Sequence, residues 1–285
     1  MATAPRLRSM RRDALVARVF TYLILVFAVL LVLFPIYWMV ITSLKLPREI
    51  YRVPALWPQV FTGANYQILI VDKGFLLNIR NSLLVAATVT VISLFIAAFA
   101  AYSMVRFRYR FKGLFGRLIL FAYLTPTSLL FIPLSILMAR FQLGNSLQGL
   151  IVVYLTFSLP LGTWLLQGYF RGVPRDLEEQ GMIDGLTRMG ALFRIMVPLS
   201  LPGLAAVAIF TFTGAWNELL LALVLITSDS IRTAPLGLNY LITSDVLPWG
   251  PLMAGAVLSS LPLMILYFVA QRFMVQGMTA GAVKG

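Results

Sequence analysis

The sequence predicts an all-α protein that crosses a membrane six times, and three observations carry this prediction. Hydrophobic residues make up 60% of the 285 residues, compared with roughly 45–50% in soluble domains. The charged residues avoid the long apolar runs and collect between them. Six of these runs reach about 20 residues, the length that a helix needs to cross the hydrocarbon core of a bilayer. Residues 1–285 are therefore interpreted as one transmembrane domain.

The six runs are expected to be helices, because an unpaired backbone amide is costly in hydrocarbon. The predicted spans are residues 19–44, 82–105, 114–139, 147–168, 201–226 and 251–273. Proline removes a backbone donor and bends a helix. Prolines that should have this effect lie inside the spans at Pro35, Pro126, Pro133, Pro160 and Pro262.

The orientation is predicted from the 23 Lys and Arg residues. Sixteen of them lie in the N-terminal tail (residues 1–18), in the connections after the second and fourth spans, and after the sixth span. Cytoplasmic loops are enriched in Lys and Arg, so both termini are predicted to be cytoplasmic. The first external loop, residues 45–81, is rich in proline and aromatic residues and is expected to form an ordered cap over a pore mouth.

Composition narrows the function classes. The chain has no Cys and no His, which removes thiol nucleophiles, disulfides, the usual zinc sites and the commonest general acid or base. The net charge is +13, but it is not arranged as the basic stripe of a nucleic-acid-binding protein. A polytopic membrane enzyme would need a catalytic constellation, and an ion-gradient transporter usually has titratable groups near the midplane. Neither is evident, so both remain weaker alternatives to a transport subunit.

The connection between the fourth and fifth spans, residues 169–200, is too organised for a linker. Asp176 and Glu179 form an Asp-x-x-Glu start signal, so a helix is expected over residues 177–184, and Gly185 is its expected stop. A second helix is expected from after Thr187 to about residue 196. The pair would present an apolar ridge flanked by acids. It could rest on lipid headgroups, but acids suit an anionic membrane surface poorly, which favours docking onto a soluble partner.

This segment resembles the EAA loop of ABC importer permeases. The family pattern has Glu-Ala-Ala, a Gly, and Ile-x-Leu-Pro at fixed spacing, and it falls on Glu179, Gln180, Gly181, Gly185, Ile195, Val197 and Pro198. Gln180 and Gly181 replace the Ala pair and Val197 replaces Leu, while the spacing is intact. The resemblance implies an ATPase-docking set of Glu178, Glu179, Gln180, Gly181, Met182, Ile183, Asp184, Gly185, Ile195 and Pro198.

The C-terminal tail, residues 273–285, is similar to that of the maltose-type carbohydrate permease family. Further points of resemblance are Glu49 with Ile50, Asn65 with Tyr66, and Asn81 with Ser82. The resemblance implies that the tail is cytoplasmic and contacts the ATPase. The tail residues expected to do so are Gln276, Gly277, Thr279, Gly281 and Lys284.

The resemblance also implies a division of labour in a bacterial or archaeal plasma membrane. Two permeases form the channel, two cytoplasmic ABC ATPases drive it, and an extracytoplasmic solute-binding protein delivers the cargo. ATP and Mg would bind to the ATPases and no cofactor to this chain, which has no GxxxxGK[ST] loop. The cargo implied is a sugar or related polyol, and glycerol phosphate, phosphate, polyamines and amino acids remain alternatives.

Three neighbouring residues of the fifth span, Trp216, Asn217 and Glu218, are candidates for the substrate path. An ionisable group inside a span is a functional candidate. A sugar could stack on the indole and hydrogen-bond to the amide. If the span starts at Leu201, Glu218 lies about 26 Å along it and near the external interface. A structural role for Glu218 and an interfacial role for Trp216 are the alternatives.

Overall fold

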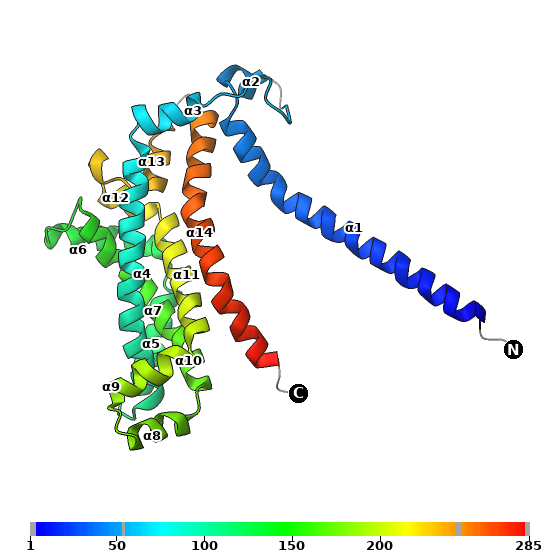
Figure 1. Ribbon diagram of the computed structural model, residues 1–285. Coiled ribbons are helices and arrows are strands. Elements are labelled where there is room, and N and C mark those ends of the chain that lie inside the picture. The colour runs from blue at the N-terminus through cyan, green and yellow to red at the C-terminus, as the bar shows by residue number, and fades with distance from the viewer. Residues whose placement is uncertain (1–3, 53–54, 243–246, 283–285) are drawn as a thin grey trace. The chain divides into compact units, whose positions relative to one another are not determined.

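The computed structural model describes residues 4–52, 55–242 and 247–282, and every regular element in these ranges is a helix. The prediction of an all-α protein is confirmed. The chain divides into two compact units (Figure 1). The first comprises residues 1–72 and 247–258, and the second comprises residues 73–246 and 259–285.

The first unit begins with α1 (Ala4–Ser43), which is followed by α2 (Pro47–Arg52), α3 (Ala64–Gln67) and a π-helical turn, η1 (Ile68–Asp72). The segment after α1 is held by side chains that bond to the backbone. The Glu49 carboxylate accepts hydrogen bonds from the amides of Gln59 and Val60 at 3.1 and 3.3 Å. The Asn65 amide donates to the carbonyls of Ser43 and Lys45, both at 2.8 Å. The predicted ordered segment is therefore present.

The second unit holds most of the helices. In chain order they are α4 (Phe75–Arg106), α5 (Lys112–Leu124), α6 (Thr127–Arg140), α7 (Leu147–Gly172), α8 (Arg175–Ile183), α9 (Arg188–Ala191), η2 (Leu192–Met196), α10 (Val197–Leu199), α11 (Leu201–Asn217), α12 (Leu220–Leu225), η3 (Asp229–Ile231) and α13 (Ala234–Asn239). The last helix, α14 (Trp249–Ala282), begins in the first unit and ends in the second.

Helices α4, α7 and α11 form the centre of the second unit, and small residues let them approach closely. A Cβ atom added to Gly162 of α7 would lie 3.2 Å from both Ala97 of α4 and Val207 of α11. Ser93 of α4 and Ser158 of α7 share a buried hydrogen bond of 2.7 Å. Small side chains and interhelical hydrogen bonds stabilise helix contacts in membranes, where the hydrophobic effect between helices is lost.

In the described ranges, four helices are long and apolar enough to cross a membrane, and up to six spans result if each of two bent helix pairs is one span. The four are residues 17–43, α4, α7 and residues 249–273. They correspond to the first, second, fourth and sixth predicted spans. The helices extend beyond the predicted bounds, since α4 begins at Phe75 and α14 continues to Ala282.

The third and fifth spans differ from the prediction of single helices. Helices α5 and α6 meet at 99°, because Thr125 and Pro126 are both extended and proline disfavours the helical conformation in the residue before it. The fifth span was predicted to continue to residue 226, but helix α11 ends at Asn217, and Glu218 is extended with ψ 124° before α12 begins. The estimate of the depth of Glu218 along one continuous helix was therefore wrong.

Candidate functional site

The loop between α7 and α11 forms a helix-turn-helix, as predicted, but its first helix starts differently. Helix α8 begins at Arg175 after Pro174, with no side chain capping it. Asp176 was predicted to be the cap, and instead it lies in the first helical turn. The prediction was wrong because proline itself fixes the backbone at the start of a helix. A carboxylate in the first turn still interacts favourably with the helix dipole.

The end of α8 at Gly185 is confirmed. Gly185 has φ +93°, a conformation that favours glycine. Its amide donates to the carbonyl of Met182 at 3.2 Å, and the amide of Leu186 donates to the carbonyl of Gly181 at 2.9 Å. This pair of bonds is a Schellman motif, which satisfies the last carbonyls of the helix and fixes the direction of the chain leaving it.

The second helix starts as predicted after Thr187, whose hydroxyl accepts a hydrogen bond from the amide of Gly190 at 3.1 Å. Helical backbone then continues through α9, η2 and α10 to Leu199, three residues beyond the expected end. The chain bends by 80° before α11. The loop is therefore continuous with a transmembrane helix through one sharp bend.

Gly181 is the point where α8 packs on η2. It is buried, and a Cβ atom added there would lie 2.5 Å from Cδ1 of Ile195 and 3.1 Å from Cδ1 of Leu186. The absence of a side chain at Gly181 lets the two helices approach to this distance. A side chain at Gly181 would require the end of the Ile195 side chain to shift.

Glu178 joins the loop to α4. It is 5% exposed, and its carboxylate pairs with Nε of Arg106 at 2.5 Å. The hydroxyl of Tyr102 donates a hydrogen bond to the other carboxylate oxygen. Arg106 also donates to the carbonyl of Val173 at 2.8 Å. One guanidinium group therefore connects the end of α4 with the end of α7 and with α8.

The predicted docking residues divide into two sets. Glu178 and Gly181 face inward, and Met182 and Ile195 are half-buried. Ile183 is 84% exposed. The other exposed members are Glu179, Gln180, Asp184, Gly185 and Pro198. Successive residues of a helix are about 100° apart, so adjacent acids of α8 serve different surfaces. We call the exposed members of α8 and its end, Glu179, Gln180, Ile183, Asp184 and Gly185, the outer face of the loop.

A separate cavity of about 200 Å³ lies among α4, α7 and α11. Hydroxyl groups of Tyr154, Ser158 and Thr211 line it, together with Glu218. The Tyr154 hydroxyl donates to the Glu218 carboxylate at 2.9 Å. The Thr211 hydroxyl is buried without a hydrogen-bond partner in the described structure. Aromatic rings from Phe157 and Phe210 complete a lining of mixed polarity.

Glu218 also has a structural role at the break between α11 and α12. Its carboxylate accepts hydrogen bonds from the amide of Leu221 at 3.0 Å and from that of Ala222 at 3.2 Å. These amides belong to the first turn of α12, whose donors would otherwise lack partners. Glu218 thus caps α12 while it lines the cavity.

The predicted substrate-path trio is not brought together at this cavity. Trp216 is 2% exposed and stacks on Phe212 at a centroid distance of 5.7 Å, so its indole is not available to a cargo in this conformation. Asn217 is exposed and does not line the cavity. The sequence reasoning missed Tyr154, Ser158 and Thr211. The sequence did contain a signal for two of them. Tyr154 and Ser158 lie four residues apart, so their hydroxyl groups share one face of an apolar helix.

The predicted ATPase-contacting tail is helical over most of its length. Gln276, Gly277, Thr279 and Gly281 belong to the C-terminal part of α14, which continues to Ala282. Lys284 lies outside the described residues.

The apolar helices, and the helical loop that continues into one of them, are those of a polytopic membrane protein. The chain matches, over residues 93–280, the family described as binding-protein-dependent transport system inner membrane component. The chain belongs to this family, so it is a multi-pass permease component of an ABC transporter.

Relatives and a solved structure agree with this assignment. The chain is 38% identical over 254 residues to the sulfoquinovosyl glycerol transport system permease protein of Agrobacterium fabrum, covering 89% of each chain. It is 32% identical to the trehalose/maltose transport system permease protein of Thermococcus litoralis, covering 96% of this chain and 99% of the relative. A bacterial ABC transporter that imports the polysaccharide alginate has the same fold, with a TM-score of 0.79 and 22% identity over 92% of this chain and 97% of the other.

Proposed function

We propose that this chain and a second permease form the translocation path of an importer for a sugar or related polyol. In this proposal the loop between α7 and α11 receives an ABC ATPase. The observation that carries it is the division of the two neighbouring acids of α8. Glu178 is buried against Arg106, while Glu179 remains exposed near the apolar side chain of Ile183.

The outer face suits a protein partner. Ile183 is the most exposed large hydrophobic side chain described, and acids at positions 179 and 184 lie close to it along the chain. An apolar contact rimmed by charges is typical of protein interfaces. The loop is held to α4 and α7 through Arg106 and continues into α11, so movement of an ATPase bound there would reach the central helices.

The remaining components follow from the family. We infer that both termini and the loop are cytoplasmic, in accord with the distribution of Lys and Arg. Two ATPase subunits would hold ATP and Mg, and this chain would bind neither. A solute-binding protein would deliver cargo from outside, as the family description indicates. The C-terminal part of α14 is proposed to extend toward the ATPases.

A carbohydrate is the cargo favoured by the relatives, whose names refer to sulfoquinovosyl glycerol and to trehalose and maltose. The cavity beside Glu218 agrees with this choice. Its hydroxyl and carboxylate groups can exchange hydrogen bonds with a polyol, and its aromatic rings can pack on the apolar face of a sugar ring. We propose Thr211 and Tyr154 as cargo contacts, in place of Trp216 and Asn217.

The docking proposal is tested by charge reversal at Glu179. The permease pair is co-expressed with its ATPase, and copurification and ATP-dependent sugar uptake into vesicles are measured together. Glu179→Lys is expected to reduce both by about tenfold or more, since it places a repulsive charge in the contact. Asp72→Lys makes the same charge change at an exposed acid outside the loop and is expected to behave as wild type. Unchanged copurification with Glu179→Lys would refute the docking role.

A further inference from the structure

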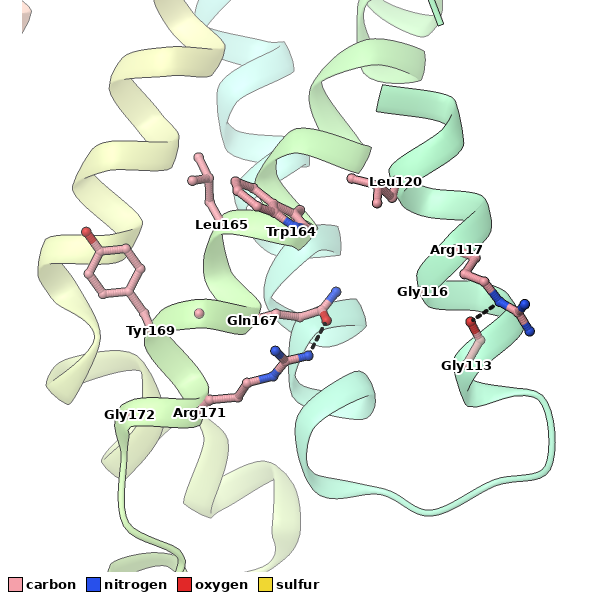
Figure 2. Close-up of a pocket in the computed structure, with 11 residues that line it drawn as sticks. Gly113, Gly116, Arg117, Leu120, Trp164, Leu165, Gln167, Tyr169, Arg171 and Gly172 are labelled. Atoms are coloured by element: carbon pink, nitrogen blue, oxygen red, sulfur yellow. Dashed lines mark hydrogen bonds between the residues drawn. The ribbon is translucent and has the colours of Figure 1, made fainter. Parts of the chain in front are cut away.

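A large open groove lies between α5 and α7, and its basic end has no counter-charge. Its volume is about 790 Å³, and it is lined by residues 113–120 of α5 and 164–172 of α7 (Figure 2). The cargo cavity beside Glu218 shares no lining residue with it. Pockets of roughly 300–1,000 Å³ are of the size that holds small ligands.

Two arginines from different helices line this groove. Arg117 donates a hydrogen bond to the carbonyl of Gly113 on its own helix at 3.3 Å. Arg171 donates to the side chain of Gln167 at 3.3 Å, and Figure 2 shows it extending from α7 toward α5. Neither forms an ion pair within the described part of the chain, and no acidic residue lines the groove. Both guanidinium groups therefore lack a carboxylate partner among the described residues. Figure 2 shows that of Arg171 directed toward α5 and that of Arg117 beside Gly113 on its own helix.

Glycines form part of the lining of the groove. A Cβ atom added to Gly113, Gly168 or Gly172 would meet no atom within 4 Å. Close packing within the chain therefore does not require glycine at these positions, although glycine destabilises a helix relative to alanine. The bare backbone leaves the space open for another molecule.

The lining changes from charged to apolar along the helices. Arg171 lies at the end of α7, and Trp164 lies seven residues earlier, which is about 10 Å along the helix axis. Trp164 is exposed and stacks on Tyr123 at a centroid distance of 6.4 Å. Leu120 faces the same end of the groove (Figure 2). A ligand with an anionic end and an apolar body fits this order.

We infer that the groove binds the headgroup of an anionic phospholipid, with its phosphate at Arg171 and its first acyl carbons along Leu120 and Trp164. The exposed side chain of Arg117 would leave Gly113 and rotate toward the same phosphate. Arginine binds phosphate through paired N–H donors. Basic pockets between transmembrane helices on the cytoplasmic side are known sites for anionic headgroups. The competing occupant is a helix of the second permease, which Gly168 and Gly172 could accommodate. The uncompensated arginines favour the phosphate.

The test uses the assembled transporter, with both permeases and the ATPases, and native mass spectrometry of retained lipid. Wild type is expected to retain phosphatidylglycerol over phosphatidylcholine with a preference of about 10- to 30-fold for two guanidinium contacts. Arg117→Gln with Arg171→Gln should bring the preference close to one. Gly168→Leu keeps both charges but fills the groove, and it should have the same effect. Millimolar inorganic phosphate should not displace the lipid.

The matched control is Arg108→Gln with Arg110→Gln, which removes two exposed positive charges outside the groove and should keep the wild-type preference. Equal retention of the two lipids by wild type, or an unchanged preference in both groove variants, would overturn the inference. Displacement by inorganic phosphate alone would also do so. The competing occupant, a helix of the second permease, is tested by cross-linking. The chain has no native Cys, so Leu120→Cys places a single reactive thiol in the groove. Efficient cross-linking of this thiol to the second permease would show that a helix fills the groove.

Discussion

Arg106 and Glu178 form a buried ion pair that joins a transmembrane helix to the helical loop outside it. The Nε and Oε2 atoms are 2.5 Å apart, and the side chains are only 7% and 6% exposed. Removing one partner of such a pair strongly destabilises the fold, because the other charge is left buried and uncompensated. The position of α8 therefore depends on a residue of α4 that is 72 residues away in sequence.

Arg106→Ala is expected to destabilise the second unit by about 3–5 kcal/mol, because it leaves the Glu178 carboxylate buried without its cation. Thermal unfolding of the purified protein in lipid nanodiscs measures this change. Arg108→Ala, at an exposed basic residue of the following connection, should change stability by less than about 0.5 kcal/mol. Equal effects of the two substitutions would contradict the importance of the pair.

Gly185→Ala is expected to weaken ATPase copurification and to cost about 1–2 kcal/mol, because a side chain is strained at φ +93°. The control is Gly190→Ala in the same loop, where the added Cβ would make ordinary contacts at 3.5 Å. Gly190→Ala should therefore copurify as wild type does. If both variants copurify normally, the Schellman turn does not position the outer face.

Thr211→Val separates cargo binding from stability. The hydroxyl of Thr211 is buried without a hydrogen-bond partner among the described residues, so its removal should leave stability unchanged or raise it by up to about 1–3 kcal/mol. If the hydroxyl binds the cargo, the KM of uptake should rise about 2- to 10-fold from the loss of one hydrogen bond. Thr90→Val removes a hydroxyl that bonds only to its own helix and should leave uptake unchanged. An unaltered KM in Thr211→Val would remove Thr211 from the cargo site.

Asn81→Ala is expected to destabilise the protein by about 1–3 kcal/mol. The Asn81 amide donates to the carbonyls of Ser230 and Arg232, both at 3.0 Å, and thereby holds the segment before α13. Thermal unfolding checks the prediction, with Asn239→Ala at the end of α13 as the control. If Asn81→Ala and Asn239→Ala both change the stability only slightly, the carbonyls of Ser230 and Arg232 find other hydrogen-bond partners when Asn81 is removed.

The elements that the sequence predicted well are those fixed by local chemistry. The ends of the loop helices at Gly185 and Thr187 depend on backbone conformation and a capping hydroxyl, which short motifs encode. The first, second, fourth and sixth spans follow from apolar length alone. Pro126 indicated a bend in the third span, but neither hydropathy nor the position of a proline gives its angle of 99°. The end of the helix at Asn217 in the fifth span was missed, because hydropathy measures composition and carries no information on direction.

The candidate site was predicted less completely, for a related reason. Trp216 and Glu218 are two residues apart in sequence, yet one packs in the core and the other lines a cavity, because the helix ends between them at Asn217. Glu178 was grouped with Glu179 by adjacency, and only the partner Arg106 from α4 distinguishes them. Pairings between distant segments decide such roles, and no local pattern contains them.

The π-helical turn η2, Leu192–Met196, lies between Gly181 and Pro198 and sets how these two residues are oriented relative to each other. A π-turn accommodates one residue more than an α-turn, and each residue of a helix corresponds to a rotation of about 100°. Deleting one residue from this turn would swivel Ile195 away from Gly181 or rotate Pro198 and the bend that follows it. The number of residues in this turn therefore fixes the direction in which α11 leaves the loop relative to α8.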